Sequence, residues 1–549
     1  MRHRATSDCL GSGRAGTGQK PSRLQRFNAW VFLSAFLLLA ACSAGLGQGQ
    51  EPRDPVKDLL ELLVRKGMLT KDEASIVRLE DDYLHTNTLN QAMPPAQSKW
   101  KISNPIKSVE LFGDLRMRYE HREATTPPGS SIVLDRGRAA LRIGLRGDAV
   151  DDFYYGLRLE TSSNPRSPWI NFGGSSPAPF GKSNTGVDLG QFYIGWRPQD
   201  WLDVTVGKMP NPLYTTPMVW DSDLNPEGAV ERFKYSVGPA GFFANFAQFL
   251  YKDNNPSFIS GSLIPQVNDL TSNGDRQETD ADATFLLAWQ AGVNAQLAQD
   301  TSAKIAPVLY NYIGHLNTNV SGMGLGDPFI GEGSYGGKGS STPINGLTSQ
   351  NNVGSPLSYN QIGINNLLVL EVPFEVNFKI KSLNARVFGD YAYNLEGSSR
   401  ALAAYRAVAY RSSAVLATAP LTQYGAQTHD VQAYQVGFAL GSLDSLGLVY
   451  GTVSRKHAWE VRTYWQHVEQ YALDPNLLDS DFFEGRGNLE GVYVSAAYGF
   501  TDNVIGTIRY GYAQRINEKL GTGGSNLDIP DINPIEHYNL LQLDLTLRF

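Results

Sequence analysis

The stretch Leu541-Gln542-Leu543-Asp544-Leu545-Thr546-Leu547-Arg548-Phe549, at the end of the chain, alternates between apolar and polar side chains. Successive side chains of a β-strand point to opposite faces of the sheet, so the leucines and Phe549 would share one face. That face suits lipid, and the face with the polar residues suits water. The pattern predicts a strand that crosses a membrane as part of an antiparallel barrel.

The same period of two recurs in many segments from about Val109 to the end of the chain. Examples are 109–120, 138–146, 153–160, 459–466 and 492–500. Short connections, such as 147–152 and 500–503, alternate with long ones, such as 163–186 and 208–228. This rhythm predicts about sixteen antiparallel strands over residues 108–549, enough to leave an aqueous channel. Residues 441–456 are an exception, because a long connection stands where a short turn is expected.

The region before the barrel contains one long apolar run, from Ala29 to Ala41, after Arg23 and Arg26. This arrangement is typical of a secretory signal peptide, which we assign to residues 1–47. The stretch Leu39-Ala40-Ala41-Cys42 would allow lipidation of Cys42, and cleavage between Ala44 and Gln48 is the alternative. A mean hydropathy of -0.27 excludes a bundle of membrane helices.

Without the signal peptide the chain has no cysteine, which excludes disulfides and thiolate metal sites. It then carries 41 basic and 53 acidic residues, a formal net charge of -12, and such a chain is not expected to bind nucleic acid. Residues 48–107 predict a periplasmic helical segment and a linker. Asp54 and Pro55 suit the start of one helix, and Thr70 with Glu73 forms a capping box for a second. These helices either bury their own leucines or serve interaction or oligomerisation.

Several segments resemble the putative porin family of Gram-negative outer membranes, over roughly residues 108–549. They are Gly207-Lys208-Met209-Pro210-Asn211-Pro212, Trp220 to Gly228, Tyr498 to Asn503, and Leu541 to Phe549. The resemblance implies an outer-membrane barrel, in contact with lipid, for passive transport of small hydrophilic solutes or ions. Leu545, Leu547 and Phe549 are similar to the C-terminal signal that the barrel-assembly machinery recognises. Resemblance to general trimeric porins implies a homotrimer and an inward-folded third external loop.

The third external loop would span residues 208–228. If it folds inward, Asp221, Asp223 and Glu227 put negative charge at a pore constriction. The alternative is a surface loop whose Asp and Asn residues make turns.

Eight basic residues lie on the polar face of their strands, at alternate positions, and would project into the lumen. They are Arg116, Arg118, Arg138, Arg142, Arg146, Arg158, Arg232 and Lys234. Facing an acidic loop, they would create a transverse field that sets ion preference. Alternatively, they pair with Glu110, Asp114, Glu120 and Glu160 and brace the wall.

No catalytic motif, cofactor site or metal site stands out in the sequence, so we do not expect an enzyme. His315, His457 and His467 could supply a hydrolase histidine only in principle. The competing interpretation is a secreted or surface β-rich binding or adhesive protein without a pore. Such a protein would share the alternation and the signal peptide, but should not end on an amphipathic strand with a terminal Phe.

Overall fold

The computed structural model describes residues 105–127, 129–162, 167–173, 186–252, 284–313, 366–401, 429–443, 445–451, 455–518, 520–522, 529 and 534–549. The signal peptide, Cys42, the two helices and nearly all of the linker lie outside these residues. Those assignments stay predictions.

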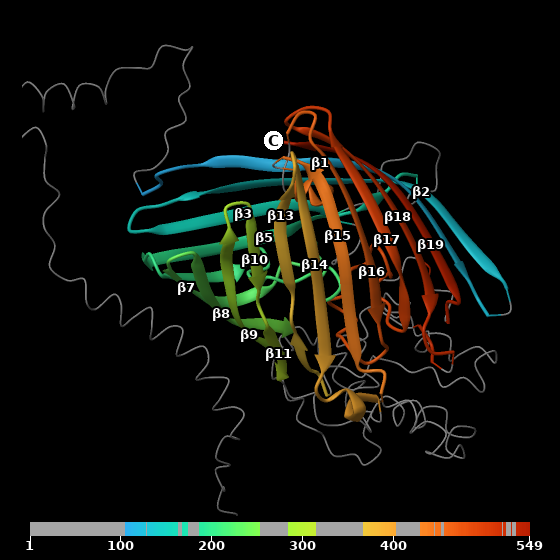
Figure 1. Ribbon diagram of the computed structural model, residues 1–549. Coiled ribbons are helices and arrows are strands. Elements are labelled where there is room, and N and C mark those ends of the chain that lie inside the picture. Colours follow the sequence, from blue (N-terminus) through green and yellow to red (C-terminus); the bar gives the residue numbers. More distant parts are fainter. Residues whose placement is uncertain are drawn as a thin grey trace, which may run out of the picture. The chain divides into compact units, whose positions relative to one another are not determined.

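The described residues form one antiparallel sheet whose strands pair in chain order (Figure 1). The strands are β1 (Glu110–Thr125), β2 (Ser131–Asp148), β3 (Phe153–Ser162), β4 (Ile170–Asn171), β5 (Gly186–Gln199), β6 (Leu202–Lys208), β7 (Glu227–Val237), β8 (Ala240–Lys252), β9 (Thr284–Ala298), β10 (Thr301–Ile305), β11 (Val308–Ile313), β12 (Leu368–Glu371), β13 (Phe374–Ile380), β14 (Leu383–Asn394), β15 (Gln432–Ser442), β16 (Trp459–Val468), β17 (Leu489–Gly499), β18 (Val504–Arg515) and β19 (His537–Arg548). The sheet closes on itself because β1 pairs with β19 from Asp114 to Thr125. Closure leaves no unpaired edge.

Some of these strands are parts of one crossing. Pro307 separates β10 from β11, and Pro373 separates β12 from β13; proline has no N–H for the ladder. The two-residue β4 continues the β3 side of β2. Counted as crossings, the described strands make a closed barrel of sixteen, which confirms the predicted fold.

The two faces of the wall differ as the alternation predicts. On β19, Leu543, Leu545 and Leu547 point outward and are between 42% and 49% exposed. They lie opposite Tyr119, Met117 and Leu115 of β1 in the register. The intervening Gln542 and Asp544 point inward and are buried. An apolar exterior and a polar interior are the arrangement that a membrane barrel requires.

The connections divide the barrel into a short-turn end and a long-loop end. The short turns between strands include residues 149–152, 200–201, 238–239, 299–300 and 500–503. Two long loops at the opposite end are described throughout: residues 209–226, called loop 3, and residues 469–488, called loop 7. The turn between β15 and β16, residues 443–458, is long although it lies at the short-turn end. These three segments build the site.

Candidate functional site

Loop 3 runs inside the barrel from β6 to the strands on the other side of the lumen. Its anchors Met209, Met218, Val219 and Trp220 are buried. Polar groups of the loop then form hydrogen bonds with the wall. The backbone N–H of Tyr214 donates to the side-chain oxygen of Gln290 on β9 at 2.9 Å, and the side-chain nitrogen of Gln290 donates to the carbonyl of Tyr214 at 2.7 Å. The hydroxyl of Thr215 donates to Glu371 on β12 at 2.6 Å, and the hydroxyl of Thr216 donates to Asp390 on β14. Because these partners lie several strands away from β6 and β7, loop 3 spans the lumen.

Loop 7 enters the same space and joins loop 3. The N–H of Asp221 donates to the carbonyl of Leu477 at 2.6 Å, and the N–H of Asp479 donates to the carbonyl of Pro217 at 3.2 Å. Ser480 donates both its N–H and its hydroxyl to a carboxylate oxygen of Asp221, at 3.1 and 3.0 Å. The two loops therefore form one layer of chain across the pore.

The structure brings together two of the three predicted loop acids. Asp221 is 4% exposed, and it accepts the N–H of Asp223 in a local turn as well as the Ser480 bonds. Burial, and then the charge of Asp223, raise the pKa of Asp221 to about 7. Asp223 lies 3.5 Å from Arg142. Glu227 instead begins β7, is exposed, and pairs with Lys208 at 2.6 Å.

The predicted basic residues lie on the strands, and the seven arginines are ion-paired. Their nearest carboxylate contacts are Arg116–Asp114 (2.7 Å), Arg118–Asp481 and Arg118–Asp544 (2.7 Å each), Arg138–Glu120 (3.6 Å), Arg142–Asp114 (2.9 Å), Arg146–Glu110 (2.7 Å), Arg158–Glu160 (2.9 Å) and Arg232–Asp203 (2.9 Å). Lys234 is exposed near the short-turn end of β7. Pairs with Glu110, Asp114, Glu120 and Glu160 all occur, as the bracing interpretation requires.

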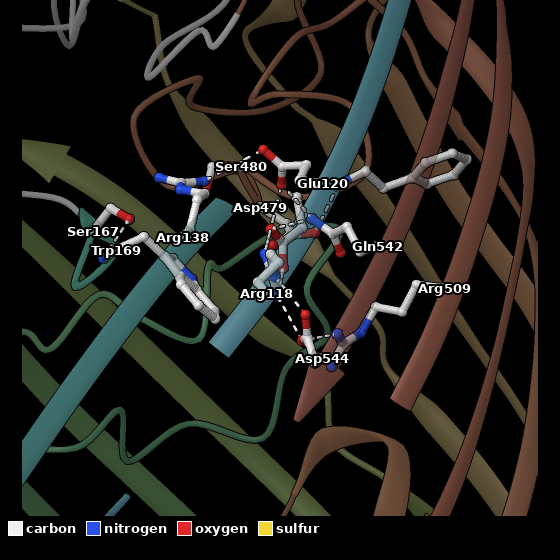
Figure 2. A network of polar contacts seen from close by, with 12 residues as sticks. Arg118, Glu120, Arg138, Ser167, Trp169, Asp479, Ser480, Arg509, Gln542 and Asp544 are labelled. Atoms are coloured by element: carbon white, nitrogen blue, oxygen red, sulfur yellow. Dashed lines mark hydrogen bonds and ion pairs between the residues drawn. The ribbon is translucent and has the colours of Figure 1, made fainter. Parts of the chain in front are cut away.

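A charged network joins the wall to loop 7 (Figure 2). Arg118 and Arg509 converge on Asp544, and Trp169 lies 4.1 Å from the Arg118 guanidinium. Burial alone would raise the pKa of Asp481, but the guanidiniums of Arg118, Arg509 and Arg122 outweigh burial and hold it well below its usual range.

Asp479, two residues before Asp481, has the opposite shift. Burial raises its pKa far above the usual range, and the charges of Asp481 and Asp221 add to that rise. The surroundings therefore favour the charged form of Asp481 and disfavour the charged form of Asp479.

The turn 443–458 supplies the other side of the site; within it, residues 444 and 452–454 lie outside the described part. Its 3-10 helix η4 (Leu448–Tyr450) lies between Gly447 and Gly451, both with positive φ. The N–H groups of Gly447 and Val449 donate to Glu460 of β16, at 2.8 and 3.1 Å. The turn is thereby held inside the barrel wall.

A cavity of about 90 Å³ lies where the wall, the two loops and the turn meet. Its lining includes Arg116 of β1, Asp223 of loop 3, Asp479 and Asp481 of loop 7, Tyr450 of the turn, and Arg462 of β16. A polar space with charges of both signs, inside a closed barrel, is suited to the passage of hydrated solutes.

Residues 125–549 match the family described as Putative porin. This chain belongs to that family. The match covers most of the barrel, including both loops of the site and the turn. The porin therefore forms a transmembrane channel. No curated protein matched the sequence.

Solved porin structures resemble this porin at low identity. OprB of Pseudomonas putida is 11% identical, with 80% of this chain and 94% of that chain covered and a TM-score of 0.40. The anion-selective porin from Comamonas acidovorans is 8% identical, with 80% and 99% covered and a TM-score of 0.37. A substituted variant of the Rh. blastica porin is 9% identical, with 80% and 100% covered and a TM-score of 0.34. The family assignment comes from the sequence match alone.

The described residues of the porin contain neither a membrane-spanning helix nor a cluster of metal-binding side chains. No helix there is long and apolar enough to span a membrane. No group of three or more His, Cys, Asp or Glu side chains there could hold a metal ion.

Several residues of the site in this porin were not singled out from the sequence. They are Arg122, Arg462, Asp479, Asp481 and Arg509. The parity rule could have found Arg122, Arg462 and Arg509, because each shares the inward face of its strand. No local signal distinguishes Asp479 and Asp481 from ordinary loop acids, since their role depends on loop 7 entering the barrel.

Proposed function

We propose that this porin is a passive diffusion channel of the outer membrane whose narrowest part is the cavity between loop 3, loop 7 and the turn 443–458. The observation that carries the proposal is that loop 3 crosses the lumen and bonds to loop 7 through Asp221 and Ser480. A solute that passes there meets the charges of Asp223, Asp481 and Arg116 in the lining of the cavity. Charges at such a point set which ions pass.

The short-turn end would face the periplasm and the long-loop end the exterior. The barrel-assembly machinery would recognise the last strand through Leu545, Leu547 and Phe549. The membrane form would be a homotrimer, which chemical cross-linking of the membrane-embedded protein would test.

Planar-bilayer recording tests the channel itself. We expect the purified full-length porin to insert and give discrete conductance steps that grow with salt concentration. Absence of conductance from protein whose barrel is folded, as shown by heat-modifiable migration on a gel, would contradict the proposal and favour the adhesive interpretation.

A further inference from the structure

Arg462 differs from the seven arginines described above. It lies on the inner face of β16, is 4% exposed, and lines the cavity. None of its nitrogen atoms has a hydrogen-bond or ion-pair partner among the described residues, and its Nε is buried. A buried guanidinium without a counter-ion is costly. Such a group in a channel points to a ligand that brings the missing charge.

The neighbouring residues of the sheet do not supply a counter-ion to Arg462. The residues beside it in the register are Ala439 on β15 and Ser495 on β17, and neither carries a charge. Glu460, two residues away on the same face, already accepts the N–H groups of Gly447 and Val449. The turn 443–458 thus binds one oxygen of this carboxylate, Oε2, while Oε1 has no hydrogen-bond partner and forms no ion pair with Arg462 among the described residues.

Aromatic rings surround the guanidinium. Its central carbon lies 3.9 Å from the ring centroid of Phe388, 4.4 Å from that of Tyr450 and 5.4 Å from that of Tyr464. Cation–π contacts of this kind use the faces of the guanidinium and the rings. They leave the N–H groups along the edge of the guanidinium for a planar acceptor. A carboxylate accepts two parallel hydrogen bonds from such an edge.

We propose that Arg462 binds the carboxylate of a small organic monoanion as it passes through the pore. The site deepens the proposed function and depends on it. The single positive charge of Arg462 matches one carboxylate. Tyr464 and Tyr493 line the cavity, with their rings stacked at 5.0 Å between centroids, and they offer a surface for the apolar part of the anion. Asp223 and the ionised Asp481 also line the cavity and disfavour anions of higher charge.

The test uses benzoate as the probe and benzamide as its uncharged counterpart. In planar bilayers with potassium chloride, benzoate should reduce the chloride conductance of the unsubstituted porin and saturate, whereas benzamide should not. Arg462→Gln should weaken the benzoate effect by about tenfold or more, the size expected when a hydrogen-bonded charge is lost. Arg462→Lys keeps the positive charge but lacks the planar guanidinium edge, so it should also weaken the benzoate effect.

Arg146→Gln is the matched control, because it removes a lumenal arginine that is paired with Glu110 and lies outside the cavity lining. It should leave the benzoate effect unchanged. Equal loss in Arg146→Gln and Arg462→Gln would mean general electrostatics and would overturn the site. Retention of the full effect in Arg462→Gln would overturn it as well.

Calorimetric titration of the detergent-solubilised porin with benzoate separates this inference from the proposed function. Benzoate binding that is lost in Arg462→Gln supports the site at Arg462. If the same porin gives no conductance in bilayers, only the channel proposal fails. Conductance without any saturable benzoate binding rejects the site alone. Folding of each variant is checked by heat-modifiable migration.

Discussion

Replacing Asp481 by Asn, and separately Arg116 by Gln, should shift the ion preference of the pore in opposite directions. Both side chains line the cavity, and both are partly exposed to it, at 31% and 24%. Each can also be removed without leaving its main partner alone. Arg118 keeps Asp544 when Asp481 is neutralised, and Asp114 keeps Arg142 when Arg116 is neutralised. We therefore expect folded barrels with altered charge at the narrowest point.

The size of the effect follows from the distance at which an ion passes. A unit charge about 4 Å from a passing ion contributes roughly 1 kcal/mol in water, which is about a fivefold change in an equilibrium. Because the same charge attracts one kind of ion and repels the other, the two fivefold effects multiply in the cation-to-anion permeability ratio, which should fall about 25-fold for Asp481→Asn and rise about 25-fold for Arg116→Gln. At high salt the screening length shrinks to about 3 Å, so both changes should be smaller.

The assay is the reversal potential under a salt gradient in planar bilayers, repeated at low and high ionic strength. Two controls remove the same charges away from the cavity: Glu227→Gln, whose partner is Lys208, and Arg146→Gln, whose partner is Glu110. Both controls should leave the permeability ratio nearly unchanged. If the cavity variants shift it no more than the controls do, the constriction is not at this place and the reasoning fails.

Three further predictions concern assembly, pH and barrel closure. Replacing Leu547 and Phe549 by Asp should prevent insertion, because acidic groups would face lipid; normal amounts of folded protein in outer-membrane fractions would contradict this. The pKa of Asp221 is raised to about 7, so its contribution to holding loops 3 and 7 together is complete below about pH 4 and is lost as the pH rises through 7. Conductance noise should therefore increase above pH 7 in the unsubstituted porin but not in Asp221→Asn, and equal pH dependence in both would refute the role of Asp221. Gly113→Ala should destabilise the barrel where β1 lies between β2 and β19 by about 1–3 kcal/mol, because its Cβ would clash with the backbone carbonyl oxygen of Arg142 and meet the Phe549 ring at 2.7 Å; an unchanged temperature of gel-shift unfolding would count against it.

The arrangement of the wall could be predicted from the sequence because the period of two is a local property. A strand such as 541–549 has only one way to place its leucines in lipid and Asp544 in water. The same rule placed Arg116, Arg118 and Arg142 on the inner face before their partners were known. The rhythm of short and long connections was sufficient for the strand number, since each crossing of a membrane needs a segment of similar length.

Pairing of Arg116 and Arg142 with Asp114 was one of the two interpretations of the sequence, but the partners that come from distant parts of the chain could not be predicted. Arg118 meets Asp544 and Asp481 only after the barrel has closed and loop 7 has turned inward. Loop 3 was expected to fold inward, yet Asp221 proved to be buried against Ser480, and Glu227 proved to pair with Lys208. A loop's charges face water or protein according to what packs on them, and the loop sequence does not contain that information.

By itself, then, the sequence determined a barrel of about sixteen strands and the face on which each strand residue lies, because side-chain alternation depends only on neighbouring residues. Tertiary structure alone decided the site. The unusually long connection near residues 441–456 was visible in the sequence, but not that it would turn into the barrel and bind one oxygen of Glu460. Arg462 has no ion-pair partner among the described residues, because the register of the closed sheet places the uncharged Ala439 and Ser495 beside it.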